Sequence, residues 1–251
     1  MCLYLGILNA VGLNLTRSAV QNAANNLILL HPEPAGFQQN PALFSTGVQT
    51  GVTYFFNISS IPYYCFDLNS RIYKENFSLS LASLGSETYQ ENRASLGYNY
   101  THKNVAAGVN LRFLQTKITN YDEATAYAVD IGLGWEINSF TSYFSFKNIT
   151  GNNYKKSKLP VVITWESSWS PTEESKLSIG LEKEDDFDFC YRMGAAYRVL
   201  ETLKLICSYQ HQPERLGAGF VVEYQKWEIS YGIRSHRYLS LTHYISLCYA
   251  F

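Results

Sequence analysis

The chain has 251 residues and a formal net charge of −1, so no broad basic surface for nucleic acid is expected. Charged residues make up 16% of the composition, below the roughly 25% of ordinary soluble domains, and aromatic residues reach 15%. No run of about 20 apolar residues follows the N-terminal stretch, so the sequence shows no transmembrane helix. Together these features point away from an ordinary soluble domain and away from a DNA or RNA partner.

The first residues, "MCLYLGILNAVGLNL", form an apolar stretch with no lysine or arginine before Arg17. This stretch is similar to the apolar region of a secretory signal that lacks its basic start. We expect residues 1–17 to be a truncated signal or an N-terminal segment. A strand or a buried plug segment is the alternative.

From about residue 48 onward, apolar and polar residues alternate with period 2, which is typical of half-buried strands. In "AYAVDIGLGWEIN", for example, Tyr127, Val129 and Ile131 share one face, and Ala128 and Asp130 share the other. Fourteen such segments are predicted. They span 45–57, 60–68, 75–84, 91–102, 104–117, 124–137, 139–149, 159–169, 174–184, 187–198, 201–211, 214–225, 227–235 and 239–251.

The connections between these segments alternate in length. Tight turns such as "HKN", "NS", "LE" and "QK" alternate with longer loops such as "GSETYQ", "TNYDE" and "GNNYKKSKL". Short turns on one side and longer loops on the other are typical of outer-membrane barrels. The sequence therefore predicts an all-β fold, a transmembrane antiparallel β-barrel of about fourteen strands over residues 45–251. A soluble barrel of the lipocalin type is the alternative.

The polarity of the two faces is inverted relative to a soluble protein. The apolar face carries aromatic residues near strand ends, among them Trp135, Trp165, Trp169 and Trp227, as expected of a surface in contact with lipid. The other face collects glycines and charged groups that we expect to line the lumen. These candidates are Arg112, Asp130, Glu136, Glu166, Arg192, Arg198, Lys204, Glu228 and Arg234.

Two readings of the lumenal charges are open. In the first, they pair across strands and fill the lumen, with Arg112 beside Asp130, and with Arg192 and Lys204 beside Glu166 and Glu182. In the second, they line a path for a substrate.

Sequence signatures of enzymes are missing. The chain has no HExxH, no phosphate-binding loop, no GxGxxG and no G-x-S-x-G elbow. His243 and Ser246 are three residues apart on a strand, which places them on opposite faces, so they form no catalytic pair. The five cysteines are scattered and odd in number, and no CxxC is present, which argues against a zinc or redox site. We expect no enzymatic activity, no metal site and no cofactor.

The chain ends on a two-faced strand, "YLSLTHYISLCYAF". Leu247, Tyr249 and Phe251 share its apolar face. This pattern resembles the C-terminal signal that the barrel-assembly machinery of the bacterial outer membrane recognises. That resemblance implies assembly into the outer membrane, in contact with its lipid.

Two stretches resemble FadL-type outer-membrane proteins, a group that includes PorV and PorQ. The first is "HPEPAGFQQNPALFS" (His31–Ser45), in which Asn40, Pro41 and Ala42 match a characteristic "NPA" sequence. It departs from the family pattern because His31 or Glu33 stands where aspartate usually precedes proline. The second is "GIRSHRYLSLTHYISLCYAF" (Gly232–Phe251), which resembles the closing hairpin of the same group.

The resemblance implies a plug inside the barrel, which we map to residues 18–44, and three functions remain open. The first is passive transport of a hydrophobic or small solute across the outer membrane, with a side opening where Pro62 interrupts a strand. The second is a PorV-like barrel that binds a secreted protein or a component of a secretion system and transports no solute. The third is a structural barrel with a filled lumen.

Overall fold

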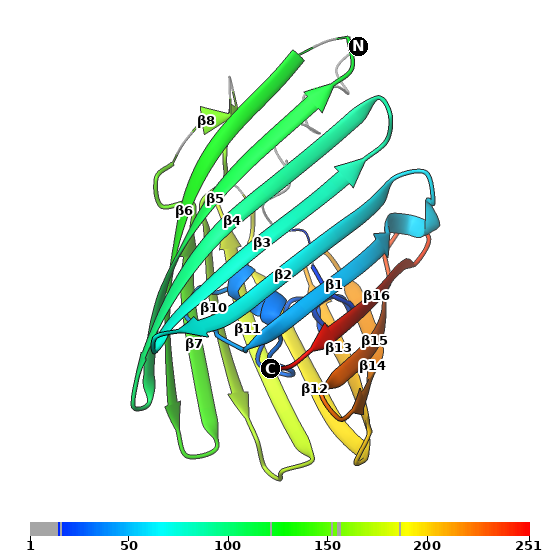
Figure 1. The fold of residues 1–251 in the computed structure, drawn as a ribbon. Coiled ribbons are helices and arrows are strands. Elements are labelled where there is room, and N and C mark those ends of the chain that lie inside the picture. Colours follow the sequence, from blue (N-terminus) through cyan, green and yellow to red (C-terminus); the bar gives the residue numbers. More distant parts are fainter. Residues whose placement is uncertain (1–14, 16, 121, 152, 155–156, 186) are drawn as a thin grey trace.

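The computed structural model describes residues 15, 17–120, 122–151, 153–154, 157–185 and 187–251. Fourteen antiparallel strands close into a barrel, and the first strand pairs with the last (Figure 1). The barrel strands are β1 (Gly47–Tyr54), β2 (Pro62–Ile72), β3 (Glu75–Gly85), β4 (Tyr89–His102), β5 (Val105–Ile118), β6 (Asp122–Ile137), β7 (Phe140–Lys147), β10 (Val162–Trp169), β11 (Ser175–Glu184), β12 (Cys190–Leu200), β13 (Leu203–His211), β14 (Arg215–Tyr224), β15 (Trp227–Arg234) and β16 (Thr242–Tyr249).

Each of the fourteen segments predicted from alternation overlaps one of these strands, so the predicted barrel is confirmed. The first strand ends earlier than expected because Phe55–Asn57 forms a 3-10 turn in which Phe56 has a φ of 54°. The loop between β7 and β10 also holds a small hairpin that the alternation did not predict. It consists of β8 (Asn153–Tyr154) and β9 (Ser157–Lys158).

Register places alternate side chains on opposite faces of the wall. At the closing seam, Val48 pairs with Tyr249 and Tyr54 pairs with His243. On β16, the even-numbered residues from Thr242 to Cys248 are buried on the inner face, whereas Ile245 and Leu247 point outward. Because the outer face is apolar and the inner face is polar, the barrel has the polarity expected of a protein in lipid.

Aromatic residues gather on the outer face at the end of the barrel with the tight turns. The Phe140 and Trp169 rings stack with centroids 6.2 Å apart, and the Trp227 and Tyr249 rings lie 4.7 Å apart. Such a belt is typical of the interface between membrane and water. Trp165 was expected near a strand end, but it lies in the middle of β10, where its ring nitrogen donates a 3.0 Å hydrogen bond to Ser142 Oγ.

The wall differs in height around the barrel. Strands β4, β5 and β6 have 14, 14 and 16 residues, whereas β1, β15 and β16 have 8 each. In Figure 1 the long strands rise well above the opposite wall at the end with the longer loops. Among the described residues, no helix combines the length and apolar character needed to cross a membrane.

Candidate functional site

The N-terminal segment lies inside the barrel and occupies its lumen, as the resemblance implied. It contains a short helix, α1 (Ala19–Ala23), and a 3-10 turn, η2 (Pro34–Gln38), and every residue of both is buried. Ser18 caps α1, because its Oγ accepts a 2.9 Å hydrogen bond from the backbone N–H of Gln21. We refer to the described residues 17–44 as the plug. The expected signal region at 1–17 lies outside the described residues, except for Leu15 and Arg17.

Inward-facing glycines provide the space in which the plug sits. A β-carbon added at Gly108 would lie 2.0 Å from the carbonyl oxygen of Pro41, and one added at Gly232 would lie 2.1 Å from that of Ala19. At Gly217 the same construction gives 2.2 Å to the carbonyl oxygen of Ala23. Real β-carbons keep more than 3 Å from such atoms, so the plug backbone approaches the wall only where the wall has no side chain.

The Asn40-Pro41-Ala42 sequence makes the closest contacts between the plug and the wall. Asn40 Oδ1 accepts a 2.9 Å hydrogen bond from the backbone N–H of Ala42, which fixes a local turn. Asn99 Nδ2, on β4, donates to the carbonyl oxygens of Pro41 and Ala42 at 3.2 and 2.6 Å. A β-carbon at Gly132 would meet Asn40 Oδ1 at 2.1 Å. The sequence matched by resemblance therefore docks the plug against β4, β5 and β6.

Glu166 holds the opposite side of the plug. Its two carboxylate oxygens accept 2.8 Å hydrogen bonds from the backbone N–H groups of Ile28 and Leu29, and Oε1 also accepts one of 2.7 Å from Ser178 Oγ. A small, partly open cavity of about 20 Å³ lies beside it, large enough for one water molecule. Glu166 was predicted as a lumen residue with a basic partner, but it bonds to the plug backbone instead.

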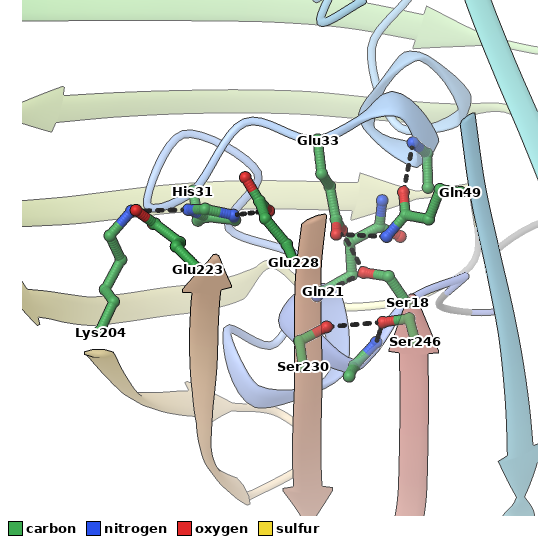
Figure 2. A network of polar contacts seen from close by, with 12 residues as sticks. Ser18, Gln21, His31, Glu33, Gln49, Lys204, Glu223, Glu228, Ser230 and Ser246 are labelled. Carbon is green, nitrogen blue, oxygen red and sulfur yellow. Dashed lines mark hydrogen bonds and ion pairs between the residues drawn. The ribbon is translucent and has the colours of Figure 1, made fainter. Parts of the chain in front are cut away.

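A second buried carboxyl group belongs to the plug itself. Glu33 accepts hydrogen bonds from Ser18 Oγ and, at 2.6 Å, from Gln49 Nε2 on β1 (Figure 2). Gln49 Oε1 in turn accepts a 2.9 Å bond from the backbone N–H of Ala35. Burial raises the pKa of Glu33 to about 8, although the two hydrogen bonds act in the opposite direction. Burial of the charged form is therefore unfavourable at this contact.

A chain of polar contacts joins the plug to the wall near the tight turns. Figure 2 shows His31 between two wall residues: its Nε2 lies 2.9 Å from Glu228, and its Nδ1 lies 2.8 Å from Lys204 Nζ. Glu223 pairs with Lys204 at 3.1 Å and with Arg198 at 3.0 Å. Three predicted lumen residues thus meet in one network. Lys204 was expected beside Glu166 or Glu182, and that pairing is wrong.

Other predicted lumen residues lie toward the longer loops. Arg112 and Asp130 form the expected ion pair at 2.5 Å, and Asp130 Oδ1 also accepts a 2.9 Å bond from the backbone N–H of Asn148. Arg192 pairs with Glu182 at 2.7 Å, one of the two acidic partners proposed for it. Arg234 faces inward at the end of β15.

The remaining predicted residues lie at the wall. Glu136 faces inward but is exposed at the tight-turn end of β6. Pro62 is the first residue of β2 and pairs with Tyr54, so a side opening there stays a prediction. Leu247 and Phe251 point outward and Tyr249 is half-buried against Trp227. Their recognition by the assembly machinery also stays a prediction.

Sequence reasoning missed three charged residues that fix the plug. Arg17 lies 3.6 Å from Asp67, Glu33 is described above, and Lys147 Nζ donates to Gln39 Oε1. Lys147 was within reach of the alternation pattern, because it shares the inward parity of Tyr143 and Ser145 on β7. Arg17 and Glu33 lie in an irregular segment with no period, so alternation did not mark them, and the resemblance singled out Glu33 only as a departure from the family pattern. Within the described residues, no group of three or more His, Cys, Asp or Glu side chains is arranged to hold a metal ion.

The same barrel is found in solved hydrocarbon channels. The chain is similar to the toluene transporter TodX of Pseudomonas putida, with a TM-score of 0.65 and 10% identity, over 93% of this chain and 98% of that chain. It is also similar to the monoaromatic hydrocarbon channel CymD, with a TM-score of 0.64 and 9% identity, over 94% of this chain and 97% of that one.

A FadL homologue of Pseudomonas aeruginosa has a TM-score of 0.64 and 9% identity, over 95% of this chain and 99% of that one. No family model and no curated protein matches the sequence. At these identities the likeness establishes the fold alone: a barrel of the kind found in these solved channels. PorV-like character has no such support.

Proposed function

We propose that this protein is an outer-membrane barrel of the FadL type that passively transports hydrophobic solutes. The observation that carries the proposal is the combination of a closed fourteen-strand barrel, an apolar outer face and a plug inside the lumen. The solved barrels that share this fold are described as a toluene transporter and a hydrocarbon channel. A location in the outer membrane, with lipid around the wall, follows from the same proposal.

The route of such a solute is constrained by the plug. Its backbone touches the wall at glycines on both sides of the lumen, so a straight path needs the plug to move. The outer face of the wall offers another route. An open depression of about 520 Å³ lies over β1 to β5, and Tyr64, Phe66, Leu81 and Phe113 line it. It adjoins β2, the strand that begins at Pro62. The ladders that join β2 to β1 and β3 are continuous, so a side opening at this place requires these strands to separate.

The test is entry of toluene into vesicles that contain the refolded protein. The outer leaflet should be lipopolysaccharide, because a bilayer of phospholipid alone already lets hydrocarbons through. We expect toluene to enter faster than into empty vesicles, whereas a disaccharide of similar or larger size enters no faster. Equal toluene entry with and without the protein would contradict the proposal. A shift in gel mobility on boiling should first establish that the barrel has folded.

The second candidate is a barrel that binds a secreted protein. The raised wall of β4 to β6 favours it, because those strands extend beyond the opposite wall at the end with the longer loops (Figure 1). It predicts that a protein partner co-purifies from native membranes and that toluene entry matches that of empty vesicles.

A further inference from the structure

The lumen contains an arginine cluster that the transport of a neutral hydrophobic solute does not use. It consists of Arg192 on β12, Arg215 on β14 and Arg234 on β15, which all face inward toward the end with the longer loops. Register brings the three together. Gln210 on β13 is the partner of both Arg192 and Arg215, and Gly217, two residues after Arg215, is the partner of Arg234.

Neighbouring strands are about 4.8 Å apart, so Arg192 and Arg215 originate about 10 Å from each other across β13. Long arginine side chains span such a gap easily. The loop residue His236 lies close enough to two of these arginines to be affected by their charges. Its pKa is lowered, first by partial burial and then by the positive charges of Arg215 and Arg234.

The cluster is short of negative charge. Arg215 and Arg234 are half-buried. The buried arginines of the described lumen outside the cluster each have a carboxylate partner: Arg17 lies 3.6 Å from Asp67, Arg93 lies 3.1 Å from Glu91, and Arg112 lies 2.5 Å from Asp130. In the cluster, Glu182 pairs with Arg192 at 2.7 Å. Among the described residues, no carboxylate lies within ion-pair distance of Arg215 or Arg234.

Two donors in the cluster are also unsatisfied. The Nε atoms of Arg192 and Arg215 are buried and have no hydrogen-bond partner. The Arg192 side chain is only 8% exposed, so bulk water does not reach it freely. Buried donors without acceptors are costly, and guanidinium groups near one another repel. Within ion-pair distance the three guanidinium groups have one carboxylate, Glu182. Glu166 lines the same small cavity as Arg192, but its oxygens bond to the plug backbone. Arg215 and Arg234 therefore have no counter-ion of their own among the described residues.

We propose that Arg215 and Arg234, with Arg192 beside them, form a binding site for an oxyanion with two negative charges, such as a phosphate or a dicarboxylate. Guanidinium groups bind carboxylate and phosphate oxygens through paired N–H donors, which suits such an anion. Because the site faces the lumen and not the lipid, its ligand is a soluble anion that enters from the side of the longer loops. The site goes beyond hydrophobic transport and does not require it.

Calorimetric titration of the refolded full chain with inorganic phosphate, and separately with succinate, tests the site at low ionic strength. We expect saturable binding of one anion per barrel, weakened at least tenfold in Arg215→Gln/Arg234→Gln. The matched control is Arg71→Gln, another inward-facing arginine at the opposite end of the barrel, bonded to Asn76. It should bind the anion as the unchanged protein does.

A third variant gives a gain of binding that misfolding cannot produce. Glu182→Gln removes the one competing carboxylate, and we expect it to tighten anion binding severalfold. Absence of binding for both anions would overturn the proposal. Equal affinity of the unchanged chain and the double arginine variant would overturn it as well. Toluene entry is measured separately, so failure of this site leaves the transport proposal standing, and the reverse also holds.

Discussion

The close contact between the plug and β5 can be tested by adding one carbon atom to the wall. Gly108 lies on β5 and faces Pro41, and a β-carbon there would lie 2.0 Å from the Pro41 oxygen, 2.3 Å from its carbon and 2.8 Å from Ala42 N. All three are backbone atoms, so no flexible side chain can turn away. In Gly108→Ala the Pro41–Ala42 turn must retreat by more than 1 Å to reach ordinary contact, which begins near 3.4 Å.

The expected cost follows from two contributions. Overpacking of a close-packed site costs about 1–3 kcal/mol. A retreat of this turn also weakens the two hydrogen bonds that Asn99 donates to Pro41 and Ala42, each with a net value of about 1 kcal/mol. We therefore expect Gly108→Ala to lower the free energy of unfolding by about 3–5 kcal/mol. The ladder from Asn99 through Gly108 to Gly132 stays intact, because alanine fits a strand.

Urea unfolding of the refolded protein measures this loss, and ion conductance in a planar bilayer reports the position of the plug. We expect higher conductance from Gly108→Ala, together with the usual shift of gel mobility on boiling. The control is Ala107→Val, which changes the outward face of the same strand and should alter stability by less than about 0.5 kcal/mol. If Gly108→Ala matches the unchanged protein in both stability and conductance, the plug is not seated against β5.

Three further predictions concern other parts of the lumen and wall. Glu166→Gln retains one acceptor for the two N–H groups of Ile28 and Leu29, so urea unfolding should show a loss of about 1–3 kcal/mol. Glu33 binds a proton in the folded protein between its ordinary pKa of 4.5 and its raised pKa of about 8, whereas the unfolded chain has released it. The contribution of Glu33 to stability should therefore be complete below pH 4.5 and be lost as the pH rises to about 8, and Glu33→Gln should flatten this slope in unfolding measured from pH 5 to 9. Ala94→Trp fills the depression over β1 to β5 and should slow toluene entry severalfold, whereas Ala218→Trp, on the outer face of β14, should leave it unchanged.

The sequence predicted the wall well because the wall follows a local rule. Alternation marks a strand within a few residues, and tight turns fix which strands are neighbours, so Arg112 could be placed beside Asp130 on the next strand. Lys204 shows where this rule stops. Its partner Glu223 lies on the adjacent strand β14, two residues from Val221, and Arg112 is offset from Asp130 by the same two residues. The expected partners Glu166 and Glu182 lie on β10 and β11, which are three and two strands away from β13. Because every strand has an inward face, alternation does not choose between carboxylates on different strands.

The plug was predictable as a segment and not as a set of contacts. Prolines at 32, 34 and 41 indicate an irregular path, but the path itself is set by where the opposing wall has glycine. Gly108 and Gly132 look in the sequence like other small residues of an inward face. Their role appears only when Asn40 and Pro41, far away in the chain, lie against them. Long-range contacts of irregular backbone have no period from which they could be read.

The two routes for a hydrophobic solute predict opposite results for Gly108→Ala and Ala94→Trp. If the solute passes straight through the lumen, the plug is the barrier, because its backbone touches Gly108 on one side and its N–H groups bind Glu166 on the other. Gly108→Ala should then speed toluene entry, and Ala94→Trp should leave it unchanged. If the solute passes through the wall beside β2, Ala94→Trp should slow entry, and the plug serves to close the lumen to ions. Conductance that rises in Gly108→Ala without faster toluene entry would assign the solute to the wall and the ions to the lumen.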